Sequence, residues 1–139
     1  MLYSQSGIKG RRKMSYGKFM ASDVANISGA SSVADGAGFT AIPLDVCDQQ
    51  IIKVQIHAKG SASGCSAAVI AKFVGSVDGA LYDTEVWSSC AVTLNGVNEV
   101  VASERFRVRG YKSIKPVAIS NVDTSNASNV GILWGKEIS

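Results

Sequence analysis

The sequence is poor in the residues that usually carry enzymatic and metal chemistry. Its 139 residues include a single histidine, His57, three cysteines, two prolines and 7% aromatic residues. A structural zinc centre normally takes four Cys, His or carboxylate ligands, so this composition leaves little room for one. The strings that bind phosphates or metals, such as GxxxxGKS, GxGxxG and HExxH, do not occur. We therefore expect no enzymatic activity, no cofactor and no metal site.

Long apolar runs are also missing. No stretch approaches the roughly 20 apolar residues of a membrane-spanning helix, and the basic run at residues 9–13 is not followed by the apolar segment of a secretory signal. A content of 46% hydrophobic residues nevertheless excludes a wholly disordered chain, and the length suits one ordinary domain. We expect a folded protein that does not enter a membrane.

The cysteines form no recognisable framework. Cys47, Cys65 and Cys90 are odd in number, and their spacings match no C-x-x-C pattern. We interpret them as buried apolar residues in a reducing compartment. The sequence is also compatible with one disulfide, without selecting a pair. A cysteine nucleophile would need His57 as its activating base, because the chain has no other imidazole.

Positive charge is concentrated at the N-terminus. Residues 1–18 hold five basic residues and no acidic one, whereas the rest of the chain holds nine basic and eleven acidic residues. Residues 1–38 are also rich in Ser, Gly and Ala, and such a segment buries too little apolar surface to fold alone. We therefore divide the chain into an extended basic arm, residues 1–38, and a folded domain, residues 39–139. The basic residues of the arm are candidates for binding a partner: Lys9, Arg11, Arg12, Lys13 and Lys18.

Period-two alternation is the main structural signal. In Ile51–Gly60, apolar residues alternate with polar ones, as in a strand with one buried face. The dipeptides Asp78-Gly79 and Asn95-Gly96 are typical of tight turns, and Pro116 places its segment at a sheet edge or a bulge. Further strands are predicted at residues 67–77, 85–94, 97–102, 105–109, 114–122 and 130–138. The pattern predicts an all-β protein, an antiparallel β-sandwich or jelly-roll-like domain.

A row of arginines is the second candidate binding site. In the strand expected at residues 105–109, Arg105, Arg107 and Arg109 share one face, about 6.5 Å apart. Such a row would pair with carboxylates on a partner or with phosphates, and its alternative interpretation is a solvated outer face. Because few aromatic residues are interleaved with the basic arm, nucleic acid is the less favoured partner.

Three further features support alternative functions. His57 is the obligatory centre of any Ser–His–acid site, but its position on the polar face of a strand favours a solvated side chain. The acidic residues Asp78, Asp83 and Glu85 would bind Ca²⁺ or form a solvated turn, and the lack of EF-hand spacing favours the turn. In a carbohydrate-binding module aromatic side chains would stack on sugar rings, and the residues available for this are Trp87, Tyr82 and Trp134.

Three segments of the domain resemble a known family. They are VGSVDG at residues 74–79, FRVRGYKSIK at residues 106–115 and VAISNVD at residues 117–123. They are similar to small β-sandwich proteins of tailed-bacteriophage virions, in which a GS-x-DG hairpin precedes an R-Y-K-x-I strand and a V-x-N-x-D strand. The similarity covers about residues 65–125 and includes no shared binding motif.

The resemblance implies a capsid decoration (cement) protein. Such proteins bind the major capsid protein or another virion protein at junctions of the shell lattice, often as trimers, so the resemblance places this chain in a virion assembled in the host cytoplasm. A head-fibre base, neck or tail component of a phage is the alternative within this class, and a carbohydrate-binding β-sandwich module is the alternative outside it. The residues are compatible with adhesion, because a domain without a catalytic constellation and with an unsupported basic arm is suited to binding other proteins.

Overall fold

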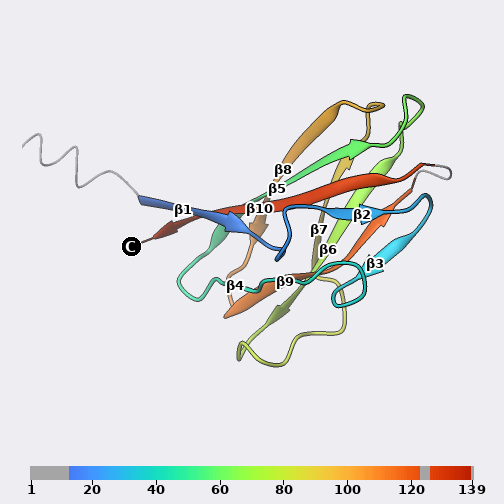
Figure 1. Ribbon diagram of the computed structural model, residues 1–139. Coiled ribbons are helices and arrows are strands. Elements are labelled where there is room, and N and C mark those ends of the chain that lie inside the picture. The colour runs from blue at the N-terminus through green and yellow to red at the C-terminus, as the bar shows by residue number, and fades with distance from the viewer. Residues whose placement is uncertain (1–12, 123–125, 139) are drawn as a thin grey trace, which may run out of the picture.

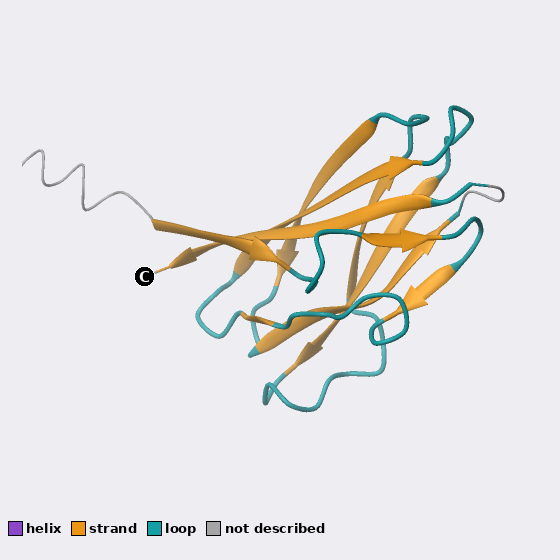
Figure 2. Ribbon diagram, in the orientation of Figure 1, coloured by secondary structure: helices purple, strands orange, loops and turns teal. Residues whose placement is uncertain are grey.

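The protein is a sandwich of two antiparallel sheets, as the computed structural model shows for residues 13–122 and 126–138 (Figure 1, Figure 2). The first sheet contains β1 (Lys13–Lys18), β2 (Ala25–Ile27), β5 (Ile51–Gly60), β8 (Glu99–Arg107) and β10 (Ser128–Ile138). The second contains β3 (Ser32–Ala34), β4 (Leu44–Asp45), β6 (Ala68–Ser76), β7 (Ser88–Thr93) and β9 (Ser113–Asn121). This arrangement confirms the predicted all-β sandwich.

The order of the strands explains which of them lie at the edges. The first sheet runs β1-β10-β5-β8, with β2 also pairing with β10, and the second runs β3-β9-β6-β7, with β4 also pairing with β9. β8 and β7 are therefore edge strands, and they follow each other in the sequence. The described residues include no helix that is long and apolar enough to cross a membrane.

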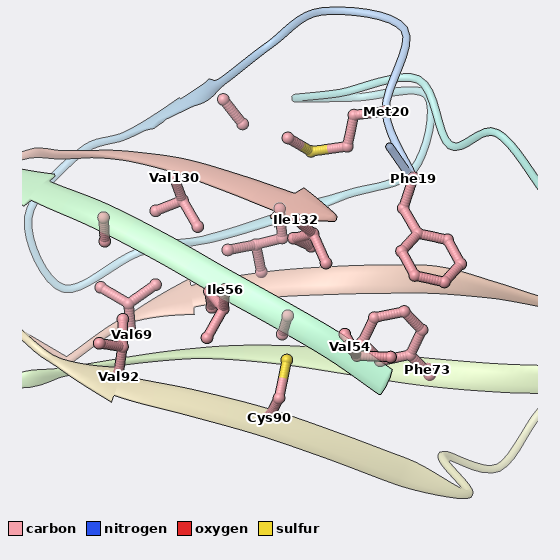
Figure 3. Packing of buried hydrophobic residues seen from close by; sticks show 14 of the residues in the cluster. Phe19, Met20, Val54, Ile56, Val69, Phe73, Cys90, Val92, Val130 and Ile132 are labelled. Carbon is pink, nitrogen blue, oxygen red and sulfur yellow. The ribbon is translucent and has the colours of Figure 1, made fainter. Parts of the chain in front are cut away.

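The core lies between the sheets and follows from the alternation of the strands. Phe73 of β6 lies in this core, with its ring 5.1 Å from the ring of Phe19 and 4.9 Å from that of Phe106. Figure 3 shows Phe19 and Phe73 close together between the two sheets. Each large side chain buried in this way contributes roughly 1.5–3 kcal/mol to stability. The inward-facing residues of β5 are likewise buried: Ile52, Val54, Ile56 and Ala58.

The boundary expected at residue 38 between an arm and a domain is wrong for the part of the arm that the structure describes. Every residue of β1 pairs with β10, and β2 and β3 join the first and second sheets. Phe19 and Met20, which follow β1, are 0% and 1% exposed. Residues 13–38 thus belong to the folded domain, because pairing with distant strands supplies stabilisation that local composition does not reveal. Residues 1–12 lie outside the described residues.

Two connections differ from the predicted pattern. Residues 99–107 form the single strand β8 where the sequence predicts two strands. The Asn95-Gly96 turn forms, with Gly96 at φ 60°, but it joins β7 of the second sheet to β8 of the first instead of closing a hairpin. A turn reverses the direction of the chain, but the two strands that flank it need not pair with each other. Pro116 pairs with Phe73 at the register shift between β6 and β9, so of the two expected placements, a sheet edge or a bulge, the irregular pairing is the one observed.

Candidate protein-binding surface

The outer face of the first sheet presents side chains of four strands in register. Cross-strand pairing places Tyr16 of β1, Gly135 of β10, Lys53 of β5 and Arg105 of β8 in one row. Neighbouring strands are about 4.8 Å apart, so the row spans roughly 14 Å. Since these residues alternate along each strand with the buried ones, they face away from the core.

Lys53, Arg105 and Arg107 form a basic cluster on this face. Lys53 lies directly opposite Arg105, Arg107 is the next outward residue of β8, and all three are exposed. The ion pairs found within residues 13–122 and 126–138 include no member of this cluster. Like charges directly opposite each other weaken a sheet, by up to about 1 kcal/mol. The stability of the fold therefore does not account for the Lys53–Arg105 pair.

Exposed apolar side chains border the basic cluster. Tyr16 is 74% exposed, Ile51 45% and Met14 43%. The Tyr16 ring lies over Gly135, where an added Cβ would approach it to 3.3 Å. Tyrosine, methionine and arginine are the residue types that protein–protein interfaces favour. We call the following six residues the mixed patch: Met14, Tyr16, Ile51, Lys53, Arg105 and Arg107.

The other predicted partner-binding residues lie elsewhere or are already engaged. Lys13 is exposed at the start of β1, an edge strand. Lys18 donates a hydrogen bond of 2.7 Å to Asp23, and this contact holds the pKa of the Asp23 carboxyl below its usual value. Arg109 lies in the turn after β8, so only two of the three arginines belong to the strand. Three predicted residues fall outside the described chain: Lys9, Arg11 and Arg12.

Four members of the mixed patch are not predicted from the sequence, Met14 and Tyr16 of β1 and Ile51 and Lys53 of β5. Alternation assigns Lys53 to the polar face of its strand, but it does not reveal which strand lies beside β5 or in which register. Tyr16 falls in the segment that composition assigns to an arm. In both cases the missing information is a pairing between segments that are far apart in the sequence.

The residues considered for nucleophilic chemistry do not converge. His57 lies on the outer face of β5, with its Nδ1 3.5 Å from the Glu99 carboxylate. Cys65 and Cys90 are buried in the core as expected, whereas Cys47 is exposed, contrary to the expectation, and all three are free. Burial raises the pKa of Cys90 to about 12, so its thiol stays protonated at neutral pH. His57 thus faces away from both buried thiols.

Two acidic residues of the loop between β6 and β7, Asp78 and Asp83, are hydrogen-bonded by the protein. Asp78 Oδ1 accepts hydrogen bonds from the N–H groups of Leu81 and Ala80, both 2.8 Å long, and these bonds lower the pKa of Asp78. The Tyr111 hydroxyl donates to Asp83 over 3.1 Å. No group of three or more His, Cys, Asp or Glu side chains in the described chain is placed to hold a metal ion. Asp78 thus stabilises the turn of its own loop, and Asp83 connects the loop to Tyr111.

The aromatic residues considered for sugar stacking are engaged by the protein. Trp87 is half-buried, and its ring lies 5.2 Å from that of Tyr111. The Tyr82 ring is covered on one side by the Lys115 ammonium group, 4.6 Å from its centroid. Trp134 packs against the hydrophobic core. The exposed ring of the mixed patch, Tyr16, lies on the outer face of the first sheet, whereas Trp134, next to its cross-strand partner Gly135, packs toward the core.

The three segments that resemble phage virion proteins meet in the second sheet. Gly75 of the first segment lies so close to the Tyr111 ring of the second that a Cβ would overlap the ring. The N–H of Lys112 donates to the carbonyl of Ser76 over 2.8 Å. β9, which holds most of the third segment, pairs with β6. The residues that carry the resemblance to phage virion proteins therefore serve chiefly to form and pack the second sheet.

Comparisons with known proteins find likeness in structure alone. No protein-family profile and no curated protein matches the sequence. Similar solved structures include a protein of the Bacillus endospore appendages, a family of disulfide-linked pili (11% identity, TM-score 0.38, covering 94% of this chain and 93% of that one). The C-terminal family 22 carbohydrate-binding module of Clostridium thermocellum Xyn10B is also similar (10% identity, TM-score 0.48, covering 88% and 91%). So is the enzymatically active domain of tailspike protein 4 of bacteriophage CBA120 (11% identity, TM-score 0.48, covering 93% and 20%). At these identities and TM-scores the likenesses assign no function to this chain.

Proposed function

We propose that this protein is a structural component of a bacteriophage virion, a capsid decoration (cement) protein that acts by adhesion and not by catalysis. Its mixed patch binds an acidic surface of the assembled capsid shell. The virion class is supported by the three segments that resemble phage β-sandwich proteins. The binding mode is supported by one observation above all, the exposed Lys53–Arg105 pair, neither member of which belongs to an ion pair found within the described residues.

The geometry of the pair suits a carboxylate-bearing protein surface. The guanidinium group of Arg105 presents a planar fork of donors that matches a carboxylate in a bidentate contact. Lys53, directly across the ladder, adds a second cation for the same or a neighbouring acid. Tyr16 and Ile51 supply apolar area beside these charges. Cross-strand hydrogen bonding holds β5 and β8 in fixed register, so little ordering of the backbone opposes binding.

Individually such contacts are weak. An exposed ion pair contributes about 0–1 kcal/mol, and the mixed patch holds three cations. A capsid repeats the same surface many times, and an oligomer that engages several copies at once binds far more tightly than one chain. A homo-oligomer on the shell is therefore part of the proposal, with preference for assembled shells over isolated capsid subunits.

The test is co-sedimentation with empty heads of the phage that encodes the chain, so that packaged DNA plays no part. The wild-type protein is expected in the pellet. The double variant Arg105→Gln/Arg107→Gln is expected to need at least about a tenfold higher concentration for half-saturation, which corresponds to about 1.4 kcal/mol. The matched control is Lys59→Gln/Lys72→Gln, which removes the same charge from outside the mixed patch and should bind as the wild type does.

Three outcomes would contradict the proposal. Wild-type protein that stays in the supernatant with heads, but sediments with purified tails or necks, belongs to another part of the virion. Equal weakening by the control variant means that net charge and not the mixed patch is responsible. Binding to an array of glycans, with none to heads, favours a carbohydrate-binding module.

A further inference from the structure

The edge strand β7 differs from the other edges of the sandwich. Its sequence, SSCAVT, contains no charged residue and no proline. β8, the corresponding edge of the first sheet, carries Glu99, Glu104, Arg105 and Arg107, and β1 carries a lysine at each end. β3 and β4 are only three and two residues long. Charged residues and short length are the usual protection of an exposed edge strand against pairing with another chain. β7 has neither, because it is six residues long and carries no charge.

The unpaired backbone groups of β7 can be assigned from its pairing with β6. The N–H of Leu94 donates to the carbonyl of Ala67 over 2.9 Å, which identifies this opposed pair as a hydrogen-bonded one. Hydrogen-bonded pairs alternate along an antiparallel ladder. Ser89, Ala91 and Thr93 therefore direct their N–H and C=O groups away from β6. All three are exposed, and in the described chain no backbone bond to a residue outside β6 engages them.

We propose that this edge pairs with β7 of a second copy of the same chain. Antiparallel pairing about a two-fold axis at Ala91 places Ala91 opposite its own counterpart. Ser89 then faces Thr93 of the second copy, and Thr93 faces its Ser89. In this register every unpaired N–H and C=O of the three residues finds a partner. The hydroxyl side chains also meet in Ser–Thr pairs, which stabilise antiparallel strands.

The charge distribution of β8 favours a second copy as the occupant. β7 and β8 lie on the same side of the sandwich, one in each sheet (Figure 1). A two-fold axis through β7 sets the β8 strands of the two copies running in opposite directions. The Glu99 end of one then lies toward the end of the other that holds Glu104, Arg105 and Arg107, whose net charge is positive. Self-association at this edge thus combines an uncharged strand pair with opposite charges above it.

The paired strand β7 shares no residue with the mixed patch, although Arg105 and Arg107 of that patch flank the proposed interface. Self-association is measured on the protein alone, so the inference stands whether or not the protein binds capsids. It also specifies the oligomer, because isologous pairing closes as a dimer, whereas the resemblance to virion proteins implies a trimer. An interface made by one strand from each copy is smaller than a standard protein–protein interface. We therefore expect a dimer that dissociates on dilution.

The test is sedimentation equilibrium of the full chain over a dilution series. Ala91→Pro removes an N–H that β6 does not use, and proline is tolerated at that kind of edge position. Ala91→Lys places two ammonium groups opposite each other at the two-fold axis. Both variants should raise the dimer dissociation constant at least about tenfold. The matched controls are Ser103→Pro, at an equivalent unpaired position of β8, and Ala118→Lys, on the outer face of the same sheet away from the edge; both should dimerise as the wild type does.

The inference is overturned if the wild type is monomeric at the highest soluble concentration, since the edge would then serve another occupant or none. It is also overturned if Ala91→Lys dimerises normally, because the copies would then meet elsewhere. Near-ultraviolet circular dichroism of each variant checks that the core is intact. If Ala91→Pro disturbs this spectrum, Ala91→Lys and Ala118→Lys alone decide the result.

Discussion

The two outer faces of the sandwich obey the same alternation and carry opposite kinds of residue. On the first sheet the outward positions hold large and charged side chains, among them Tyr16, Lys53 and Arg105. On the second sheet small ones predominate, among them Ser89 and Ala118, although Lys72 lies opposite both. Core packing constrains only the inward-facing residues of each strand. The outward-facing residues are therefore free to suit whatever each face contacts. An uneven, cationic face suits a different partner molecule, whereas an uncharged edge bordered by small residues suits a copy of itself.

Removing the central aromatic side chain should destabilise the whole sandwich, and with it both outer faces. Phe73→Ala deletes a buried ring that packs edge-on against Phe19 and Phe106, and we expect a loss of about 3–5 kcal/mol in the free energy of unfolding. Its neighbour Lys72 faces outward, so Lys72→Ala should change stability by no more than about 0.5 kcal/mol. Urea denaturation measures both. Similar losses for the two variants would contradict the assignment of inner and outer faces.

A smaller effect distinguishes the two sides of the first sheet. A Cβ at Gly17 would overlap the ring of Trp134, which is packed against the core, so Gly17→Ala should cost about 1–3 kcal/mol. A Cβ at Gly135 meets only the exposed ring of Tyr16, at 3.3 Å, and that ring is free to move. Gly135→Ala should therefore be close to neutral in the same urea experiment. A loss for Gly135→Ala as large as that for Gly17→Ala would show that Tyr16 is fixed and not free.

The mixed patch predicts a substitution that strengthens the fold. Arg105→Glu replaces a like-charged neighbour of Lys53 by an opposite charge, and we expect a gain of about 0.2–1 kcal/mol. The corresponding change on the second sheet, Lys72→Glu, creates no such pair and should bring no gain. Thermal unfolding at low salt compares the two, and high salt should reduce the difference. If Arg105→Glu destabilises the protein, the Lys53–Arg105 pair does not weaken the sheet, and the argument that it is retained for binding fails.

The smallest effect concerns the loop at the end of the second sheet, outside both faces. Bonds from Leu81 and Ala80 lower the pKa of Asp78 below its ordinary value of 3.8. A depressed pKa stabilises the folded state fully above pH 3.8, and this stabilisation disappears as the pH falls through the lower, folded-state pKa. Asp78→Ala should therefore lower the urea midpoint slightly at pH 7 and less in stronger acid. A difference that is constant or grows on acidification would refute the assignment.

The sequence specifies the individual strands better than their partners. The alternation of Ile52 and Val54 with polar residues predicts β5 at its observed bounds, and the outward direction of Arg105 and Arg107 follows from Phe106 between them. What it does not contain is register. That Lys53 lies opposite Arg105 depends on contacts about fifty residues apart in the chain.

The N-terminal segment illustrates the same limit. Residues 13–38 have the composition of a linker, and composition predicts an arm because it measures only what a segment does alone. In the structure, β10 supplies a full ladder for β1, and the core covers Phe19. The Asn95-Gly96 turn is likewise predicted correctly as a turn, but its role as a crossing between the sheets is set by the packing of the whole domain.

The most direct test of the central claim is the location and orientation of the protein on heads saturated with it, determined by cryo-electron microscopy. We predict one density for each repeat of the shell lattice, with the outer face of the first sheet turned toward the capsid surface and Arg105 near acidic capsid residues. Density confined to a single vertex, or copies bound with that face turned to solvent, would contradict the account.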